Sequence, residues 1–178
     1  VYKRQERRNT LLTMGAGNGF LNFFGGLKTV YGDWMALPEG MMRIVEFGNN
    51  GPDSRQFASF NVETLPMKHR EESIGYRITD SEGKSVVYSG DTDATDNLIS
   101  LAAGADLLIC ESAMPDALKI PGHLTPSLAG DIAARANVKK LVLTHLYPEC
   151  DQVDMAAQCR KTYKGPLLVA EDLMRIEV

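Results

Sequence analysis

The sequence predicts an α/β domain with a mixed sheet, and three observations indicate this fold class. The chain has 178 residues, of which 44% are hydrophobic, enough for one globular domain with a sizeable core. Residues 42–90 contain mostly short apolar or alternating stretches of the kind that form β-strands. After Asp91, helix-like and strand-like stretches alternate, which is typical of α/β proteins.

The first half of the chain is predicted to hold one helix followed by strands. Residues 16–31 carry apolar side chains close to helical spacing, although two adjacent glycines weaken that prediction. Residues 43–47 and 57–69 are predicted strands, separated by the turn-rich stretch GNNGPDS. Two further strands, 74–80 and 84–90, flank Ser81-Glu82-Gly83, a signal for a tight hairpin.

The second half is predicted to alternate between helices and strands. Thr125 is expected to cap one helix and Pro126 to occupy its first position, with Leu128, Ile132 and Ala136 on its apolar face. The predicted helices cover residues 95–103, 126–136 and 153–163, and the predicted strands cover residues 105–111, 139–145, 166–170 and 173–178.

Composition narrows the function classes. Lys and Arg total 19 against 23 Asp and Glu, a net charge of -4 without a basic block, so charge does not indicate nucleic-acid binding. Cys110, Cys150 and Cys159 form no paired framework and are expected to be buried thiols, which suits a reducing cytoplasm. No apolar run reaches membrane-spanning length, so we expect a cytoplasmic location and no membrane partner.

The first five residues need separate treatment. VYKRQ is the translation of GTG TAT AAG AGA CAG, which looks like the end of a transposon-type sequencing adapter. We therefore expect Val1–Gln5 to be non-native and residues 6–178 to be a domain whose upstream part is missing.

Four side chains with metal-binding chemistry fall at or near strand ends. His69 and His145 end predicted strands, Asp91 follows a strand and a glycine, and His123 lies two residues before a helix cap. Imidazole nitrogen and carboxylate oxygen bind zinc and similar divalent ions, and ligands from one rim of a sheet can converge. Each residue alone has an ordinary structural interpretation, but together they favour a metal site.

Five segments in order resemble the carboxyl-terminal half of a metallo-β-lactamase-fold hydrolase, particularly the branch that includes ribonuclease Z. These segments are MKHREESIGYRI, VVYSGDTD, LLICESA, GHLTPSLAGDIAARANVKKLVLTHL and EDLMRIEV. The resemblance covers roughly residues 42–178. It implies the second half of a four-layer αββα sandwich.

The resemblance also implies a site and a reaction. His69 would bind the first of two divalent ions, His145 the second, and Asp91 both. Glu111 would orient His123, which would protonate the departing oxygen. The implied activity is hydrolysis of a phosphodiester or ester-like substrate by a metal-activated hydroxide. Zinc is the most common metal of such sites, with manganese and iron left open.

Other polar residues receive structural interpretations. Asp93 and Asp96 are expected to be turn and helix-start acids. Gly90 is expected to let the backbone come close where a side chain would collide. A zinc knuckle of His145, Cys150 and Cys159 has no usual spacing, and GAGNGF is only a loose match to a phosphate loop.

Departures from the family pattern set the remaining expectations. The family's His-x-His-x-Asp-His loop is absent from the sequence, so half of the site is missing and the chain itself is expected to have little or no activity. The alternative is a non-catalytic, metal-free binding or scaffold domain. The connection between residues 80 and 84 is short where many ribonuclease Z proteins carry an insertion. This favours a small-molecule or nucleotide phosphodiester over transfer RNA as the substrate, and other RNA stays open. A homodimer also stays open.

Overall fold

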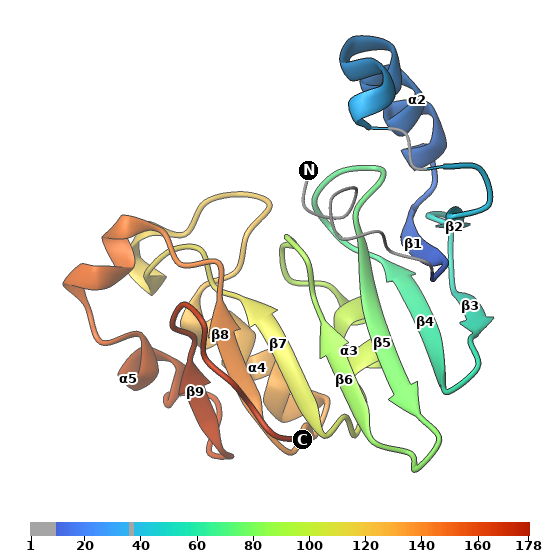
Figure 1. Cartoon of the computed structure of the whole chain (residues 1–178). Coiled ribbons are helices and arrows are strands. Elements are labelled where there is room, and N and C mark those ends of the chain that lie inside the picture. The colour runs from blue at the N-terminus through green and yellow to red at the C-terminus, as the bar shows by residue number, and fades with distance from the viewer. Residues whose placement is uncertain (1–9, 36–37) are drawn as a thin grey trace. The chain divides into compact units, whose positions relative to one another are not determined.

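A computed structural model describes residues 10–35 and 38–178, and the chain divides into two compact units with their boundary between Gly48 and Asn49 (Figure 1). The expectation that Val1–Gln5 are non-native lies outside the described residues. In the part of the chain that the structure describes, no helix has both the length and the apolar character needed to cross a bilayer.

The first unit is a two-stranded parallel sheet with a helix between its strands. Its elements are β1 (Leu12–Gly17), α2 (Phe20–Tyr31), the 3-10 turn η1 (Gly32–Trp34) and β2 (Met42–Phe47). The predicted helix starts later than expected because residues 16 and 17 pair with β2 as part of β1, a strand that was not predicted. The backbone N–H of Leu21 donates to the Glu46 carboxylate at 2.8 Å, which satisfies a free amide in the first turn of α2.

The second unit is built on a seven-stranded mixed sheet. The strands lie in sequence order, antiparallel from β3 to β6 and parallel from β6 to β9. Their bounds are β3 (Asp53–Gln56), β4 (Phe60–Pro66), β5 (Ile74–Asp80), β6 (Ser85–Tyr88), β7 (Leu107–Glu111), β8 (Leu141–Thr144) and β9 (Leu167–Val169). The predicted mixed sheet and α/β class are therefore confirmed.

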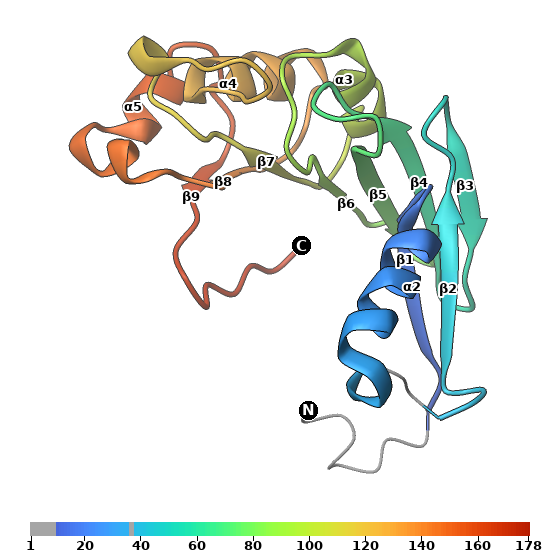
Figure 2. The ribbon, with the colours of Figure 1, turned by 90° about the horizontal axis from the view of Figure 1, so that it is seen from above.

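Three helices lie on one face of this sheet (Figure 2). They are α3 (Asp96–Ala102), α4 (Pro126–Arg135) and α5 (Met155–Cys159), with 3-10 turns η2 (Asp116–Leu118) and η3 (Pro148–Gln152) in the connections. Thr95 caps α3 by accepting from the Asn97 amide at 3.3 Å. Thr125 stands at the cap position of α4 as predicted, although its hydroxyl makes no capping bond.

The core lies between the sheet and these helices. Its members share near-complete burial and come from the central strands and the inner helix faces: Val87, Leu98, Leu108, Cys110, Ala129, Ile132, Leu141, Leu143 and Cys159. All three cysteines are free and buried, as predicted. Burial raises the pKa of the Cys159 thiol to about 11, so it is a packing residue and not a reactive thiolate.

Three predicted elements differ from the structure. Residues 173–178 form no strand. Leu173 has φ 64°, which is outside the β region, and its side chain is 99% exposed. The predicted turn 48–54 is shorter than expected, because residues 53 and 54 belong to β3 and pair with β4. The predicted helix 153–163 is shortened to α5, which Asp154 caps by accepting from the Ala157 amide at 2.8 Å.

The strand directions bring distant loops to one edge of the sheet. β6, β7 and β8 are adjacent and parallel, so their carboxyl ends meet there. β4 runs in the same direction as β6 because two antiparallel pairings separate them. The loops that follow these strands therefore share this edge.

Candidate metal centre

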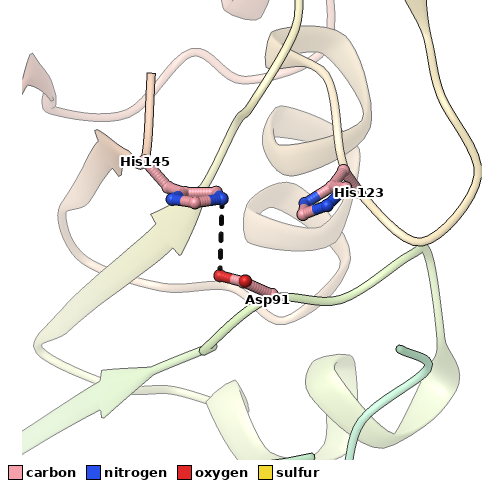
Figure 3. A group of neighbouring side chains, drawn as sticks. All are labelled: Asp91, His123 and His145. Atoms are coloured by element: carbon pink, nitrogen blue, oxygen red, sulfur yellow. Dashed lines mark ion pairs between the residues drawn. The ribbon is translucent and has the colours of Figure 1, made fainter. Parts of the chain in front are cut away.

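Three of the predicted site residues come together at this edge. Asp91, His123 and His145 each offer a ligand atom, and these atoms lie within 4.8 Å of one another (Figure 3). Nε2 of His145 is 3.6 Å from Oδ1 of Asp91, the dashed contact in Figure 3. Asp91 follows β6, His145 follows β8, and His123 precedes α4.

The backbone is unusual at two of these positions. Gly90, directly before Asp91, has φ 59°, and His145 itself has φ 58°. A Cβ on Gly90 would lie 3.4 Å from the Ile74 carbonyl oxygen, an ordinary contact, so glycine is needed for this conformation more than for the close approach that was expected. A left-handed histidine costs about 1–2 kcal/mol and is the kind of strain that clusters at functional sites.

Glu111 is the buried acceptor that joins the loops around the site. Its side chain is 2% exposed and accepts four hydrogen bonds. Oε1 accepts from the Thr92 amide at 2.8 Å and from Nδ1 of His123 at 2.9 Å. Oε2 accepts from the amides of Ala113 at 3.2 Å and Leu124 at 3.0 Å. One carboxylate therefore fixes the loops after β6 and β7 and the entry to α4.

His123 is oriented by this carboxylate. Because a carboxylate accepts, Nδ1 of His123 carries the proton and Nε2 remains for another partner. The His123 ring lies 5.4 Å from the ring of His145 and 6.1 Å from that of Tyr147. Tyr147 also meets His145 edge-on at 5.3 Å; it was not a predicted site residue, and no feature of its local sequence marks it.

His69 lies beside this group but not within it. It is exposed in the loop between β4 and β5, and its Nδ1 donates to the Gly122 carbonyl at 3.1 Å. Its ring is 5.0 Å from the His123 ring. The structure thus gathers Asp91, His123 and His145, and holds His69 next to His123.

Asp93 and Asp96 differ in their surroundings. Asp96 is the first residue of α3, as expected, and pairs with Arg135 at 3.1 Å. Asp93 instead accepts from the Lys119 ammonium and the Gly122 amide, each at 3.1 Å, so it acts on the loop before His123. The residue type gave no signal for this contact.

The donor set fits a divalent ion. Among the described residues, the buried Nε2 of His145 has no hydrogen-bond partner. A buried polar atom without a partner is costly, and a metal ion would relieve this cost. Two imidazoles and a carboxylate are typical zinc ligands. Cys150 and Cys159 are not in the group, and Sγ of Cys150 donates to the Ala113 carbonyl at 3.3 Å, so the knuckle alternative gains no support.

Comparisons with known proteins agree with the fold. Residues 31–146 match the family model described as beta-lactamase superfamily domain. An uncharacterized protein of Mycobacterium leprae is 42% identical over 103 residues, covering 57% of this chain and 36% of the relative. A ribonuclease Z of Methanothermobacter thermautotrophicus is 37% identical over 112 residues, covering 61% of this chain and 36% of the relative. The chain thus spans little more than a third of the length of these curated relatives.

A solved structure extends the likeness in fold to nearly the whole chain. The metallo-beta-lactamase fold protein YhfI from Bacillus subtilis superposes with a TM-score of 0.75 at 23% identity, covering 96% of this chain and 67% of that protein. At this identity the likeness concerns the fold alone. Together with the family match over well over half of the residues, it shows that the chain belongs to the beta-lactamase superfamily domain family and has the metallo-β-lactamase fold, with ribonuclease Z among its relatives.

Proposed function

We propose that this chain supplies one side of the site of a two-metal hydrolase. Asp91 would bridge two divalent ions, His145 would bind one and His69 the other. The observation that carries this proposal is the buried, unpartnered Nε2 of His145, 3.6 Å from the Asp91 carboxylate. When bound, such ions, commonly zinc and otherwise manganese or iron, polarise the scissile group and lower the pKa of water.

His123 and Glu111 would supply the proton for the leaving oxygen. The Glu111 carboxylate holds Nδ1 of His123 at 2.9 Å, so the proton to be delivered sits on Nε2 of the imidazolium. The same carboxylate stabilises the positive charge of the ring before delivery. Because Glu111 is fixed by three backbone amides, it holds the ring without a change of its own position.

The substrate would be a phosphodiester or an ester-like compound. Relatives named ribonuclease Z support a phosphodiester, and both small nucleotides and RNA carry this group. The net charge of -4 and the short 81–84 turn between β5 and β6 favour a small substrate over structured RNA, since a phosphate backbone is bound mainly by Lys and Arg. The buried free thiols fit a reducing cytoplasm.

The missing ligands would come from a longer protein. We infer that residues 6–178 form part of a hydrolase domain and that Val1–Gln5 are not native to it. Two histidines and a shared aspartate leave each ion with too few ligands, so the chain alone would bind metal weakly and show little activity.

The geometry also favours a second arrangement. His123, and not His69, shares the group with Asp91 and His145, so a single ion bound by these three residues is the competing site. In that arrangement Nε2 of His123 binds metal and delivers no proton. The alternative to an enzyme is a non-catalytic binding or scaffold domain that holds no metal.

Zinc titration of the full chain separates these proposals. Because the chain has three histidines, long-range ¹H–¹⁵N spectra report each imidazole. The two-ion site predicts that Zn²⁺ changes the ring nitrogens of His145 and His69; the single-ion site predicts His145 and His123. His145→Ala is the control and should remove the response. Spectra that do not change even with Zn²⁺ in large excess, enough to occupy a weak site, favour the non-catalytic domain.

Activity is then tested in a longer protein. A version that carries a His-x-His-x-Asp-His loop should hydrolyse a chromogenic phosphodiester, and His145→Ala should abolish turnover. A metal-loaded protein of this kind without phosphodiesterase or esterase activity would contradict the proposed reaction.

A further inference from the structure

The carboxylate of Asp93 holds the segment that precedes His123. Oδ2 accepts from the Gly122 amide and from the Lys119 ammonium, each at 3.1 Å, and Oδ1 accepts from the Ala94 amide at 2.8 Å. The Asp93 side chain is 18% exposed and that of Lys119 is 31% exposed, so these charged bonds are partly shielded from water. A charged acceptor in such a place makes stronger bonds than a neutral one.

Gly122 in turn holds His69. Its carbonyl accepts from Nδ1 of His69 at 3.1 Å, and its φ of 85° turns the peptide toward that ring. A Cβ on Gly122 would lie 3.0 Å from Nδ1, so a larger residue would displace the imidazole. Because a carbonyl can only accept, the neutral ring carries its proton on Nδ1 and leaves Nε2 free for a metal.

The same aspartate also contacts the loop of His69 through its backbone. The Asp93 amide donates to the Lys68 carbonyl at 2.8 Å, and the Lys68 amide donates to Oγ1 of Thr92 at 3.0 Å. Asp93 therefore bonds on one side to the neighbour of His69 and on the other to the glycine that holds its ring. Lys68, Asp93, Gly122 and His69 are thus linked in a ring by three hydrogen bonds and the peptide bond between Lys68 and His69.

We propose that Asp93 is a positioning residue that fixes the Nδ1–H tautomer and the orientation of His69 by holding Gly122. The role deepens the proposed function and rests on His69 being a metal ligand there. Asp93 acts on His69 indirectly, because it accepts from the peptide N–H before the Gly122 α-carbon while His69 donates to the peptide C=O after it. In metal sites, a ligating histidine commonly donates its second ring N–H to a carboxylate or a backbone carbonyl, which fixes its tautomer. Here the acceptor is the Gly122 carbonyl, and the Asp93 carboxylate holds that glycine in place.

The ionised state of Asp93 suits this task. As a carboxylate, it accepts from Ala94, Lys119 and Gly122 at the same time. A neutral amide at this position has a different effect. In Asp93→Asn the side-chain NH₂ faces either the donors of Gly122 and Lys119 or the amide of Ala94, so one set of bonds is lost.

The test is the tautomer of His69 in the metal-free full chain at about pH 8, a condition chosen from the ordinary pKa of imidazole. Long-range ¹H–¹⁵N spectra of the unmodified chain should show the proton of His69 on Nδ1. Asp93→Asn should convert this single form into a mixture with Nε2–H, while the backbone spectrum stays that of a folded protein. Asp96→Asn, an acid on the neighbouring helix start, is the matched control and should leave His69 unchanged.

Zinc binding gives a second readout. Asp93→Asn should weaken Zn²⁺ binding by about tenfold, the lower end of the range for residues that support metal ligands, and Asp96→Asn should not. If the unmodified chain binds no Zn²⁺ even when the ion is in large excess, enough to occupy a weak site, the proposed function fails, yet the tautomer still reports on Asp93.

Two results would overturn the role of Asp93. One is an unchanged Nδ1–H form of His69 in a folded Asp93→Asn variant. The other needs no variant: the Gly122 amide should exchange slowly with D₂O in the unmodified chain, and exchange at the rate of an unprotected amide would show that the bond to Asp93 is not held.

Discussion

Replacing Glu111 with glutamine tests whether one buried carboxylate holds the loops of the site together. The substitution keeps the size of the side chain but exchanges an acceptor oxygen for an NH₂ donor. In the structure Oε1 faces the donors of Thr92 and His123, and Oε2 faces those of Ala113 and Leu124. In either orientation the new NH₂ opposes two donors.

The cost follows from the two bonds that are lost. Hydrogen bonds to a charged group contribute about 1.5–3 kcal/mol each, so Glu111→Gln should lower the free energy of unfolding by about 3–6 kcal/mol. For a chain of this size, each kcal/mol lowers the melting temperature by about 2–4 °C, which gives a shift of about 6–24 °C. The 2% exposure of the Glu111 side chain leaves little access for water to replace these bonds.

Urea unfolding followed by circular dichroism measures this change. Glu63→Gln is the control, because the Glu63 side chain is 49% exposed and its contact with Arg77 is 4.0 Å long. That substitution should cost less than about 1 kcal/mol. A Glu111→Gln variant within about 1 kcal/mol of the unmodified chain would refute the view that this carboxylate organises the site.

Three further outcomes are expected. Hydrogen bonds from Lys139 and Ser85 lower the pKa of Asp106 from 3.8 to about 2. The ionised carboxylate therefore stabilises the folded state above its ordinary pKa, and this stabilisation is lost as the pH falls toward 2. Because the Lys139 side chain is 69% exposed, this stabilisation is about 1 kcal/mol. Urea unfolding at about pH 5 and pH 3 should show that Asp106→Asn loses less stability on acidification than the unmodified chain, and equal losses would contradict this prediction. Gly130→Ala in α4 should destabilise by about 1–3 kcal/mol, because a Cβ would lie 2.8 Å from the Cys159 carbonyl. Gly25→Ala in α2, where nothing lies within 4 Å, should stabilise by up to about 1 kcal/mol; thermal melts that give both variants the same sign would refute the packing argument.

The residues alone were sufficient to predict the elements around the site and the chemistry of its side chains. β5 was predicted with its observed bounds and α4 to within one residue, because strong periodicity and the Thr125-Pro126 start are local signals. Asp91 and His145 were predicted as candidate ligands because an acid or histidine at the end of a strand is visible in the order of residues, and the structure brings these two side chains together. The pairing of Glu111 with His123 was expected from the resemblance and is present at 2.9 Å.

Other features depended on the tertiary structure. The order of strands decided that His123 joins Asp91 and His145 while His69 stands beside them, and loop geometry decided that Asp93 supports Gly122. Residues 173–178 alternate like a strand, yet no strand forms there, because a strand needs a neighbour for its backbone groups. Local sequence specifies the conformation that a segment prefers and the chemistry that it carries; which groups meet depends on pairing and loop closure between distant segments, and no short stretch contains that information.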